Sequence, residues 1–151
     1  MKLKLEKRSI ILLSTITALF ILSVMLFFLA GNNLDRRILF FPGKGNYSGE
    51  IRHVPRQKSR EDNIEVFVKE LILGPYSIDH YRIIPQKTKL QNLLLRNKSK
   101  LYIDFSADFI VSEEDLAIIP SEMIALIRKN LVYNFPFLKD VSISVDGQRL
   151  Q

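Results

Sequence analysis

The sequence predicts an α+β protein: an N-terminal transmembrane helix, then a two-layer sandwich of two helices on one face of a small mixed or antiparallel sheet. The first observation is a charge-free apolar stretch at residues 9–31 of the 151-residue chain. The second is that helical and strand-like patterns alternate in the order β, β, α, β, β, α, β. About 120 residues follow the apolar stretch, which is enough for one modest core.

The apolar stretch has the length of a membrane span. As a helix it reaches about 30 Å, the thickness of the hydrocarbon core of a bilayer. A cleaved signal peptide has a shorter apolar region, roughly 7–15 residues, and small residues at positions −3 and −1. Cleavage after Ala30 would place Phe28 at −3, and cleavage after Gly31 would place Leu29 there. The stretch is therefore predicted to be an uncleaved anchor.

Basic residues flank this stretch unequally, and the excess predicts its orientation. Lys2, Lys4, Lys7 and Arg8 precede it, and Arg36, Arg37 and Lys44 follow it. We expect residues 1–8 to form a cytoplasmic basic tail and residues 9–31 to cross the cytoplasmic (inner) membrane once. Residues 36–151 then form an extracytoplasmic domain, which lies in the periplasm.

Charge and composition exclude several classes of function. Of the net charge of +6, the tail contributes four positive charges and one negative charge, so about +3 remains for the domain. No stripe of Lys and Arg with interleaved aromatic residues indicates a nucleic-acid partner. Without cysteine there is no disulfide, cysteine nucleophile, thiolate metal site or lipidated N-terminal Cys, and two histidines exclude a His-rich metal site.

The domain begins with two predicted strands. Residues 36–41 are apolar and aromatic, and Pro42 and Gly43 end this run. Residues 43–49 are rich in glycine and are predicted to form a loop. Residues 50–54 alternate loosely and pair back as a second strand, which Pro55 ends.

The first domain helix has clear signals at both ends. Ser59 is the expected N-cap, with Asp62 as the acid of a capping box. Gly74 and Pro75 end the helix. Its core-facing stripe consists of Ile64, Phe67, Val68, Leu71 and Ile72.

After a polar connector over 76–82, two strands are predicted at 90–96 and 100–105 on either side of a hairpin turn. Residues 106–115 are irregular, and residues 112–115 resemble a helix start. Since Pro120 would break a long helix, the second main helix is placed at about 121–133. The alternating residues 141–145 form the last strand, and Asp146 and Gly147 form a turn.

Several motifs, in order, resemble the GerMN domain family of sporulation and spore germination. Glu70-Leu71-Ile72-Leu73-Gly74-Pro75 resembles the family's helix end, and Ile84-Pro85-Gln86-Lys87-Thr88-Lys89-Leu90 its I-P-x-x-T-x-L motif. Leu101-Tyr102-Ile103-Asp104-Phe105-Ser106 is similar to its "l-y-V-D-l-S" strand. Asn130, Phe135-Pro136 and Val145-Asp146-Gly147 match later positions. The Arg36-Arg37-x-x-Phe40-Phe41-Pro42 entry looks like that of stand-alone membrane-anchored members in spirochaetes.

The resemblance implies a domain that offers surface rather than catalysis. GerMN domains resemble ring-building domains of envelope assemblies, which pack side by side. The chain departs from many members in lacking a lipidated Cys, and Leu131 stands where Thr is common. These departures concern the sporulation roles and not the fold.

The residues with chemical potential are better explained structurally, so no catalytic, cofactor-binding or metal-binding residue is assigned. Ser77, Asp79 and His80 are too close in sequence to line up as a triad. Glu113, Glu114 and Asp115 fit helix capping better than acid–base work, and Asp104 and Asp108 lack the further oxygen ligands that a cation needs. His53 is isolated.

The sequence therefore favours a non-enzymatic, membrane-anchored scaffold or interaction subunit of a cell-envelope assembly. Its expected partners are the membrane and other envelope proteins or further copies of the chain. The alternative is a module that binds peptidoglycan or another cell-wall polymer, in a groove lined by Tyr47, Tyr76 and Tyr81. A cell-wall hydrolase would need a pair of positioned acids, such as Glu113 and Glu114.

Overall fold

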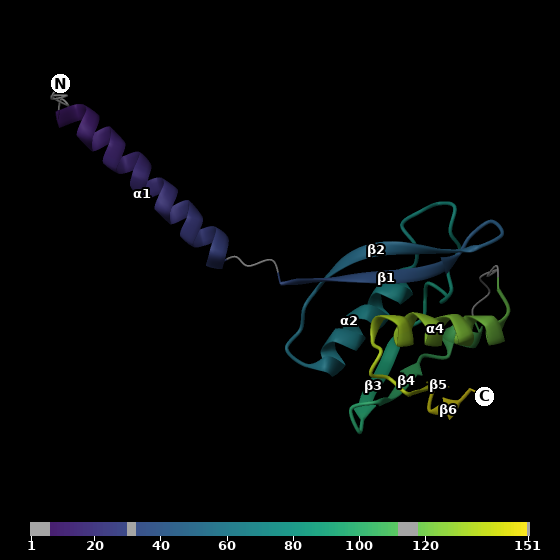
Figure 1. Cartoon of the computed structure of the whole chain (residues 1–151). Helices are drawn as coiled ribbons and strands as arrows, with labels where there is room; N and C mark the ends of the chain where they lie inside the picture. The colour runs from purple at the N-terminus through teal and green to yellow at the C-terminus, as the bar shows by residue number, and fades with distance from the viewer. Residues whose placement is uncertain (1–6, 30–32, 112–117, 151) are drawn as a thin grey trace. The chain divides into compact units, whose positions relative to one another are not determined.

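The computed structural model describes residues 7–29, 33–111 and 118–150 (Figure 1). The chain divides into two compact units, residues 1–33 and 34–151. The first unit contains helix α1, Lys7–Leu29, within which Ser9–Leu29 is long and apolar enough to cross a membrane. Three of its hydroxyls bond within the helix: Ser14 and Thr15 donate to the carbonyl of Ile11, and Thr17 donates to that of Leu13. Such internal bonds suit a helix in an apolar surrounding.

The second unit is the α+β domain that the sequence predicts. Its elements are β1 (Leu34–Pro42), β2 (Tyr47–Pro55), α2 (Arg60–Leu73), β3 (Leu90–Arg96), β4 (Lys100–Phe105), α3 (Asp108–Val111), α4 (Pro120–Asn134), β5 (Asp140–Val145) and β6 (Gln148–Arg149). The order of the main strands and helices is the predicted one, and β6 is an additional short strand after the turn at Gly147.

The main sheet is mixed, with the strand order β3-β4-β5-β6. β4 runs antiparallel to β3 and parallel to β5, and α4 belongs to the crossover between these two parallel strands. The alternation of β4 is confirmed, because Leu101, Ile103 and Phe105 are buried while Tyr102 is exposed. The α+β class with helices on one face of a small mixed sheet is therefore confirmed.

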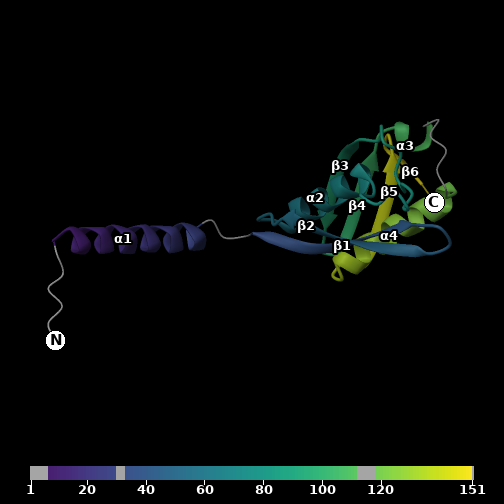
Figure 2. The ribbon, with the colours of Figure 1, turned by 90° about the horizontal axis from the view of Figure 1, so that it is seen from above.

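The first two strands do not join that sheet. Among the described residues, β1 and β2 pair only with each other, in a two-stranded antiparallel hairpin. In Figure 1 the hairpin lies above α2 and α4, and the main sheet lies below them. Figure 2 shows the domain from above, with the hairpin toward the viewer. Leu39 and Phe41 of β1 are fully buried, so the hairpin covers the helices as a third layer that the sequence did not predict.

Several boundaries also differ from the prediction. β2 begins at Tyr47, so the expected loop over 43–49 is shorter, and Gly43 closes it by donating to Asn46 O at 2.8 Å. α4 includes Pro120 at its first turn, where the missing N–H of proline costs no hydrogen bond. The stretch over 106–115, expected to be irregular, contains the short helix α3. The expected helix start at 112–115 lies outside the described residues.

Candidate functional site

The residues that superficially suggest a triad hold a loop instead. His80 Nδ1 lies 2.8 Å from Glu50 Oε1, and the Ser77 hydroxyl accepts the N–H of Asp79 at 3.3 Å. No hydrogen bond joins the Ser77 hydroxyl to the His80 imidazole in the described part of the chain. Asp79 is exposed, and its nearest cation is Lys44 at 3.9 Å. This arrangement gives no nucleophile–base pair.

Glu50 is the centre of a buried ionic network. It accepts the N–H groups of Tyr76 and Ser77 and forms an ion pair with Arg52, which also pairs with Glu70. Burial by itself raises the pKa of Glu50, but the Tyr76 N–H, His80, the Ser77 N–H and Arg52 together lower this pKa to about 2. The carboxylate therefore stays ionised at neutral pH and fastens the loop after α2 to β2.

The other acidic and histidine candidates are separated. Asp104 Oδ1 accepts the Ser144 hydroxyl at 2.7 Å and the Gly147 N–H at 3.0 Å, so it fixes the turn after β5. Asp108 accepts the Ser106 hydroxyl at 3.1 Å, and His53 is exposed on β2. Among the described residues no three acidic or histidine side chains gather as a metal site would require. Glu113, Glu114 and Asp115 lie outside the described residues.

Two of the three tyrosines proposed for a wall-binding groove come together. Tyr47 and Tyr81 line a surface hollow of about 340 Å³ at the β1–β2 turn, with Gly43, Gly45, Asn46, Pro42 and Ile118. Tyr76 lies elsewhere, with its ring 3.9 Å from the guanidinium carbon of Arg52. Tyr47 also belongs to a strand rather than to a loop.

One edge of the hairpin is closed by side chains of α4. The N–H of Phe40 donates to Asn130 Oδ1 at 2.7 Å, and Asn130 Nδ2 donates back to Phe40 O at 2.9 Å. Asn134, one helical turn later, makes the same pair of bonds with Ile38 at 3.0 and 2.6 Å. The two amides take the place of a neighbouring strand along β1.

The opposite edge, that of β2, is open. Because Ile38 and Phe40 turn their backbone groups toward α4, their cross-strand partners Ile51 and Gly49 turn theirs away from β1. His53 follows the same alternation. In the part of the chain that the structure describes, no strand or side chain pairs with the backbone of these three β2 residues. Their N–H and C=O groups are therefore available to an added strand.

The outer face beside this edge carries apolar side chains alongside the exposed Arg36 and His53. Ile51 is 51% exposed, and the ring of Phe40 packs edge-on against Tyr133 with centroids 4.9 Å apart. A Cβ at Gly49 would lie 3.0 Å from Ile38 Cγ2 and 3.4 Å from Phe40 Cε1. Glycine therefore leaves room for these two side chains of the neighbouring strand. An open edge combined with exposed apolar residues is a typical interaction surface.

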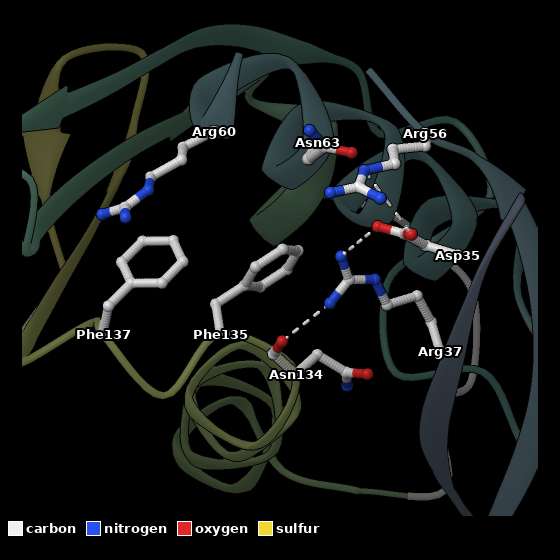
Figure 3. Close-up of a pocket in the computed structure, with 8 residues that line it drawn as sticks. All are labelled: Asp35, Arg37, Arg56, Arg60, Asn63, Asn134, Phe135 and Phe137. Carbon is white, nitrogen blue, oxygen red and sulfur yellow. Dashed lines mark hydrogen bonds and ion pairs between the residues drawn. The ribbon is translucent and has the colours of Figure 1, made fainter. Parts of the chain in front are cut away.

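A second candidate site is a pocket of about 190 Å³ lined by arginines (Figure 3). Arg37 donates to Asp35 Oδ2 and to Asn134 O, both at 2.8 Å. Arg56 lies 4.0 Å from Asp35 Oδ1. The remaining lining residues are Arg60, Asn63, Phe135 and Phe137. Three guanidinium groups and one carboxylate give the pocket a formal charge of +2.

The family model of Germane, described as sporulation and spore germination, matches residues 38–151. The chain belongs to the Germane family. The match covers β2, both main helices and the whole mixed sheet, so the predicted resemblance to GerMN domains is confirmed. No curated protein matches the chain.

Solved structures show the same Germane fold. The tandem GerMN domains of the sporulation protein GerM from Bacillus subtilis match 78% of this chain with a TM-score of 0.55 and 18% identity. Our chain spans 41% of the length of that tandem protein, so it holds one such domain where GerM has two. The first GerMN domain of the same protein, covered to 86%, matches 77% of this chain with a TM-score of 0.50 and 18% identity.

Sequence reasoning missed the main features of the Germane domain surface. The sequence indicates Asn130 only as a family position and predicts no role for Asn134. Their spacing of four residues on one helix face was the available signal, because a buried amide in an apolar stripe must find hydrogen-bond partners. The arginine pocket has no such signal, since its residues come from the start of β1, the segment after β2, the first turn of α2 and the end of α4 with the residues that follow it.

Proposed function

We propose that the chain is a non-enzymatic, membrane-anchored scaffold or interaction subunit of a cell-envelope assembly, with its Germane domain outside the cytoplasm. α1 acts as a single uncleaved anchor with the N-terminus inside. The domain binds other envelope proteins, or further copies of this chain, by adding a strand to the open edge of β2.

The observation that carries this proposal is the asymmetry of the hairpin. The β1 edge is closed by Asn130 and Asn134, whereas the β2 edge is open over residues 49–53. Main-chain hydrogen bonds supply affinity in strand addition, and side chains on alternate positions supply specificity. Ile51 and Tyr47 offer such side chains, at 51% and 52% exposure.

The polar candidates support the non-enzymatic part of the proposal. His80, Asp104 and Asp108 each hydrogen-bond within the domain and fix a loop, a turn or a helix start. The anchor supports the interaction role, because tethering to a surface raises the effective concentration of a domain for other membrane proteins.

A photo-crosslinking amino acid at position 51 of the full-length protein tests the proposal in intact cells. We expect crosslinks to specific envelope proteins or to a second copy of the chain. The same probe at Tyr102, which is exposed on the main sheet, serves as the control position. Equal crosslinking from both positions, or none from position 51, would contradict the proposal.

Substitution Ile51→Pro then tests strand addition itself. The N–H of Ile51 points away from β1, so proline removes a donor from the open edge without breaking the hairpin. Partner capture should fall at least about tenfold, because a proline at the edge blocks an added strand. Ile51→Thr keeps the N–H and should retain most of the capture. Equal capture by the proline variant and the wild type would exclude strand addition at this edge.

A peptidoglycan-binding module is the second candidate, and the hollow formed by Tyr47 and Tyr81 favours it. Its volume of about 340 Å³ is at the lower end of small-ligand sites, and it combines aromatic rings with polar backbone. Co-sedimentation of the full-length protein with purified cell walls tests this function. Tyr81→Ala should abolish co-sedimentation and Tyr102→Ala should not; co-sedimentation that survives Tyr81→Ala would rule the hollow out.

A further inference from the structure

We propose that the pocket formed by Arg37, Arg56 and Arg60 binds a phosphate group, as a phosphomonoester or a phosphodiester. Planar guanidinium groups bind phosphate oxygens through paired N–H donors, which makes arginine the preferred residue for such ligands. Nothing in the scaffold role requires this site, so it is a separate property of the domain.

The charge of the pocket favours an anion. Asp35 neutralises one guanidinium: it accepts a hydrogen bond from Arg37 at 2.8 Å and lies 4.0 Å from Arg56. Arg60 has a partner of a different kind, the ring of Phe137, at 4.8 Å from its guanidinium carbon. The pocket therefore keeps a net charge of +2, and Arg60 has no carboxylate partner among the lining residues.

Two of the three arginines, Arg37 and Arg60, are held in place by aromatic rings or by the backbone. The guanidinium carbon of Arg37 lies 4.5 Å from the centre of the Phe135 ring, and Arg37 also donates to Asn134 O. In Figure 3, Arg37 lies between Asp35 and Asn134, and Arg60 lies across from Phe137. Stacked guanidinium groups lose less side-chain entropy when they bind a ligand. The pocket is therefore partly preorganised.

The ends of the two helices also favour an anion. Arg60 and Asn63 belong to the first turn of α2, so the positive end of this 14-residue helix faces the site. α4 ends at Asn134, and a bare C-terminal carbonyl would repel an anion. The hydrogen bond from Arg37 occupies that carbonyl. The same turn carries Glu61 and Asp62, but neither lines the pocket, so the arginines and the start of α2 dominate the field inside it.

The size and the place of the pocket indicate which phosphates it accepts. A volume of about 190 Å³ is below that of sites for drug-sized ligands and suits a phosphate with a small substituent. Only residues 30–33 separate α1 from β1 in the sequence, which limits the span from Leu29 to Leu34 to about 18 Å. An anchored domain is therefore within reach of lipid headgroups, so the phosphate comes from an anionic lipid or from a soluble compound.

Two titrations of the full-length protein distinguish these sources. In nanodiscs of phosphatidylcholine alone, inorganic phosphate is added and arginine side-chain N–H signals are followed by NMR. In parallel, the phosphatidylglycerol content of the nanodiscs is raised stepwise from zero to about three parts in ten, with phosphatidylcholine as the remainder. A saturable response of the Arg56 and Arg60 signals to soluble phosphate supports a free ligand, and a response to phosphatidylglycerol alone supports a headgroup.

The double variant Arg56→Gln/Arg60→Gln supplies the loss-of-binding test. Both side chains are exposed, and loss of a positive charge from the first turn of α2 does not weaken that helix. We expect at least about a tenfold loss of affinity. Lys87→Gln/Lys89→Gln removes the same charge from exposed positions outside the pocket and should change affinity less than about twofold.

Asp35→Asn should raise the affinity for phosphate, in contrast to the double arginine variant. It removes the carboxylate that competes for Arg37 and Arg56 while keeping an acceptor oxygen of similar size. We expect phosphate affinity to rise about three- to tenfold. Three results would each contradict the proposed phosphate site. Neither titration saturates, or the lysine variant loses as much affinity as the arginine variant. The third is that Asp35→Asn weakens binding although circular dichroism shows that the protein stays folded.

Discussion

At the scale of single residues, two arginines complete the end of α2. Arg82 donates to the carbonyls of Leu73 and Ile72 at 3.0 and 2.6 Å, and Arg52 donates to those of Glu70 and Gly74. The last carbonyls of a helix have no partner within it, so these bonds satisfy groups that the helix itself leaves unpaired. Arg52 is only 3% exposed and is neutralised by Glu50 and Glu70.

Glu50 should make the stability of the domain depend on pH in the acidic range. Its folded-state pKa of about 2 is below its ordinary value of 4.5, so the unfolded state binds the proton more tightly. The stabilisation is complete above pH 4.5 and is lost as the pH falls toward 2. A pKa shift of this size contributes about 3 kcal/mol to the free energy of unfolding.

Glu50→Gln tests this prediction. At pH 6 the free energy of unfolding of the variant should be about 3 kcal/mol lower than that of the wild type. Near pH 2 the two proteins should have similar stability. Urea denaturation of both proteins across this range measures the difference. Glu65→Gln is the control, since the Glu65–Lys69 pair is largely exposed and contributes at most about 0.5 kcal/mol. A constant difference at every pH would show that the charge of Glu50 is irrelevant.

Two features require glycine at position 74: its backbone conformation and the lack of room for a side chain. Its φ is +83°, and a Cβ there would lie 2.6 Å from Arg82 Nη1. Gly74→Ala should therefore cost about 1–3 kcal/mol in backbone strain and also push Arg82 off the end of α2. Gly45→Ala shares a positive φ of +97° but meets nothing within 4 Å. Thermal unfolding should show a larger loss at position 74; equal losses would mean that the contact with Arg82 has no effect.

At the scale of elements, the hairpin is attached to α4 by the amides of Asn130 and Asn134. Asn130 is fully buried, and its Nδ2 also donates to Leu126 O at 3.0 Å. An amide is the side chain that suits this place, because it offers a donor and an acceptor side by side, as a neighbouring strand does.

Asn130→Asp should therefore destabilise the domain by about 2–4 kcal/mol. The carboxylate keeps the acceptor for the Phe40 N–H but faces the carbonyls of Phe40 and Leu126 without a donor. Denaturation at pH 7 measures this loss. Asn92→Asp, at an exposed position of β3, is the matched control and should change stability by less than about 0.5 kcal/mol. Equal stability of the two variants would contradict the role of the amide.

At the scale of the whole molecule, local patterns predicted the elements but not every layer. The capping of α2 by Ser59 and the alternation of β4 are short-range features, and both are confirmed. The separate hairpin depends on side chains that meet a strand edge some 90 residues away in the sequence, such as Asn130 and Phe40. Hydrophobic periodicity carries no information on such contacts.

The candidate sites were predictable to a smaller extent. The pairing of Tyr47 with Tyr81 was anticipated as a groove, although Tyr76 lies outside it. The arginine pocket combines Arg37, Arg56 and Arg60, which no sequence motif connects. Sites assembled from the ends of several elements depend on tertiary structure and leave little trace in local sequence.

Amide hydrogen exchange of the full-length protein in membranes tests the central claim most directly. Without a partner, the N–H groups of Ile38 and Phe40 should exchange slowly and those of Ile51 and His53 rapidly, since only the first pair is hydrogen-bonded. In the crosslinked complex with its envelope partner, Ile51 and His53 should become protected. Rapid exchange of these two amides in the complex would show that the open edge of β2 does not bind the partner.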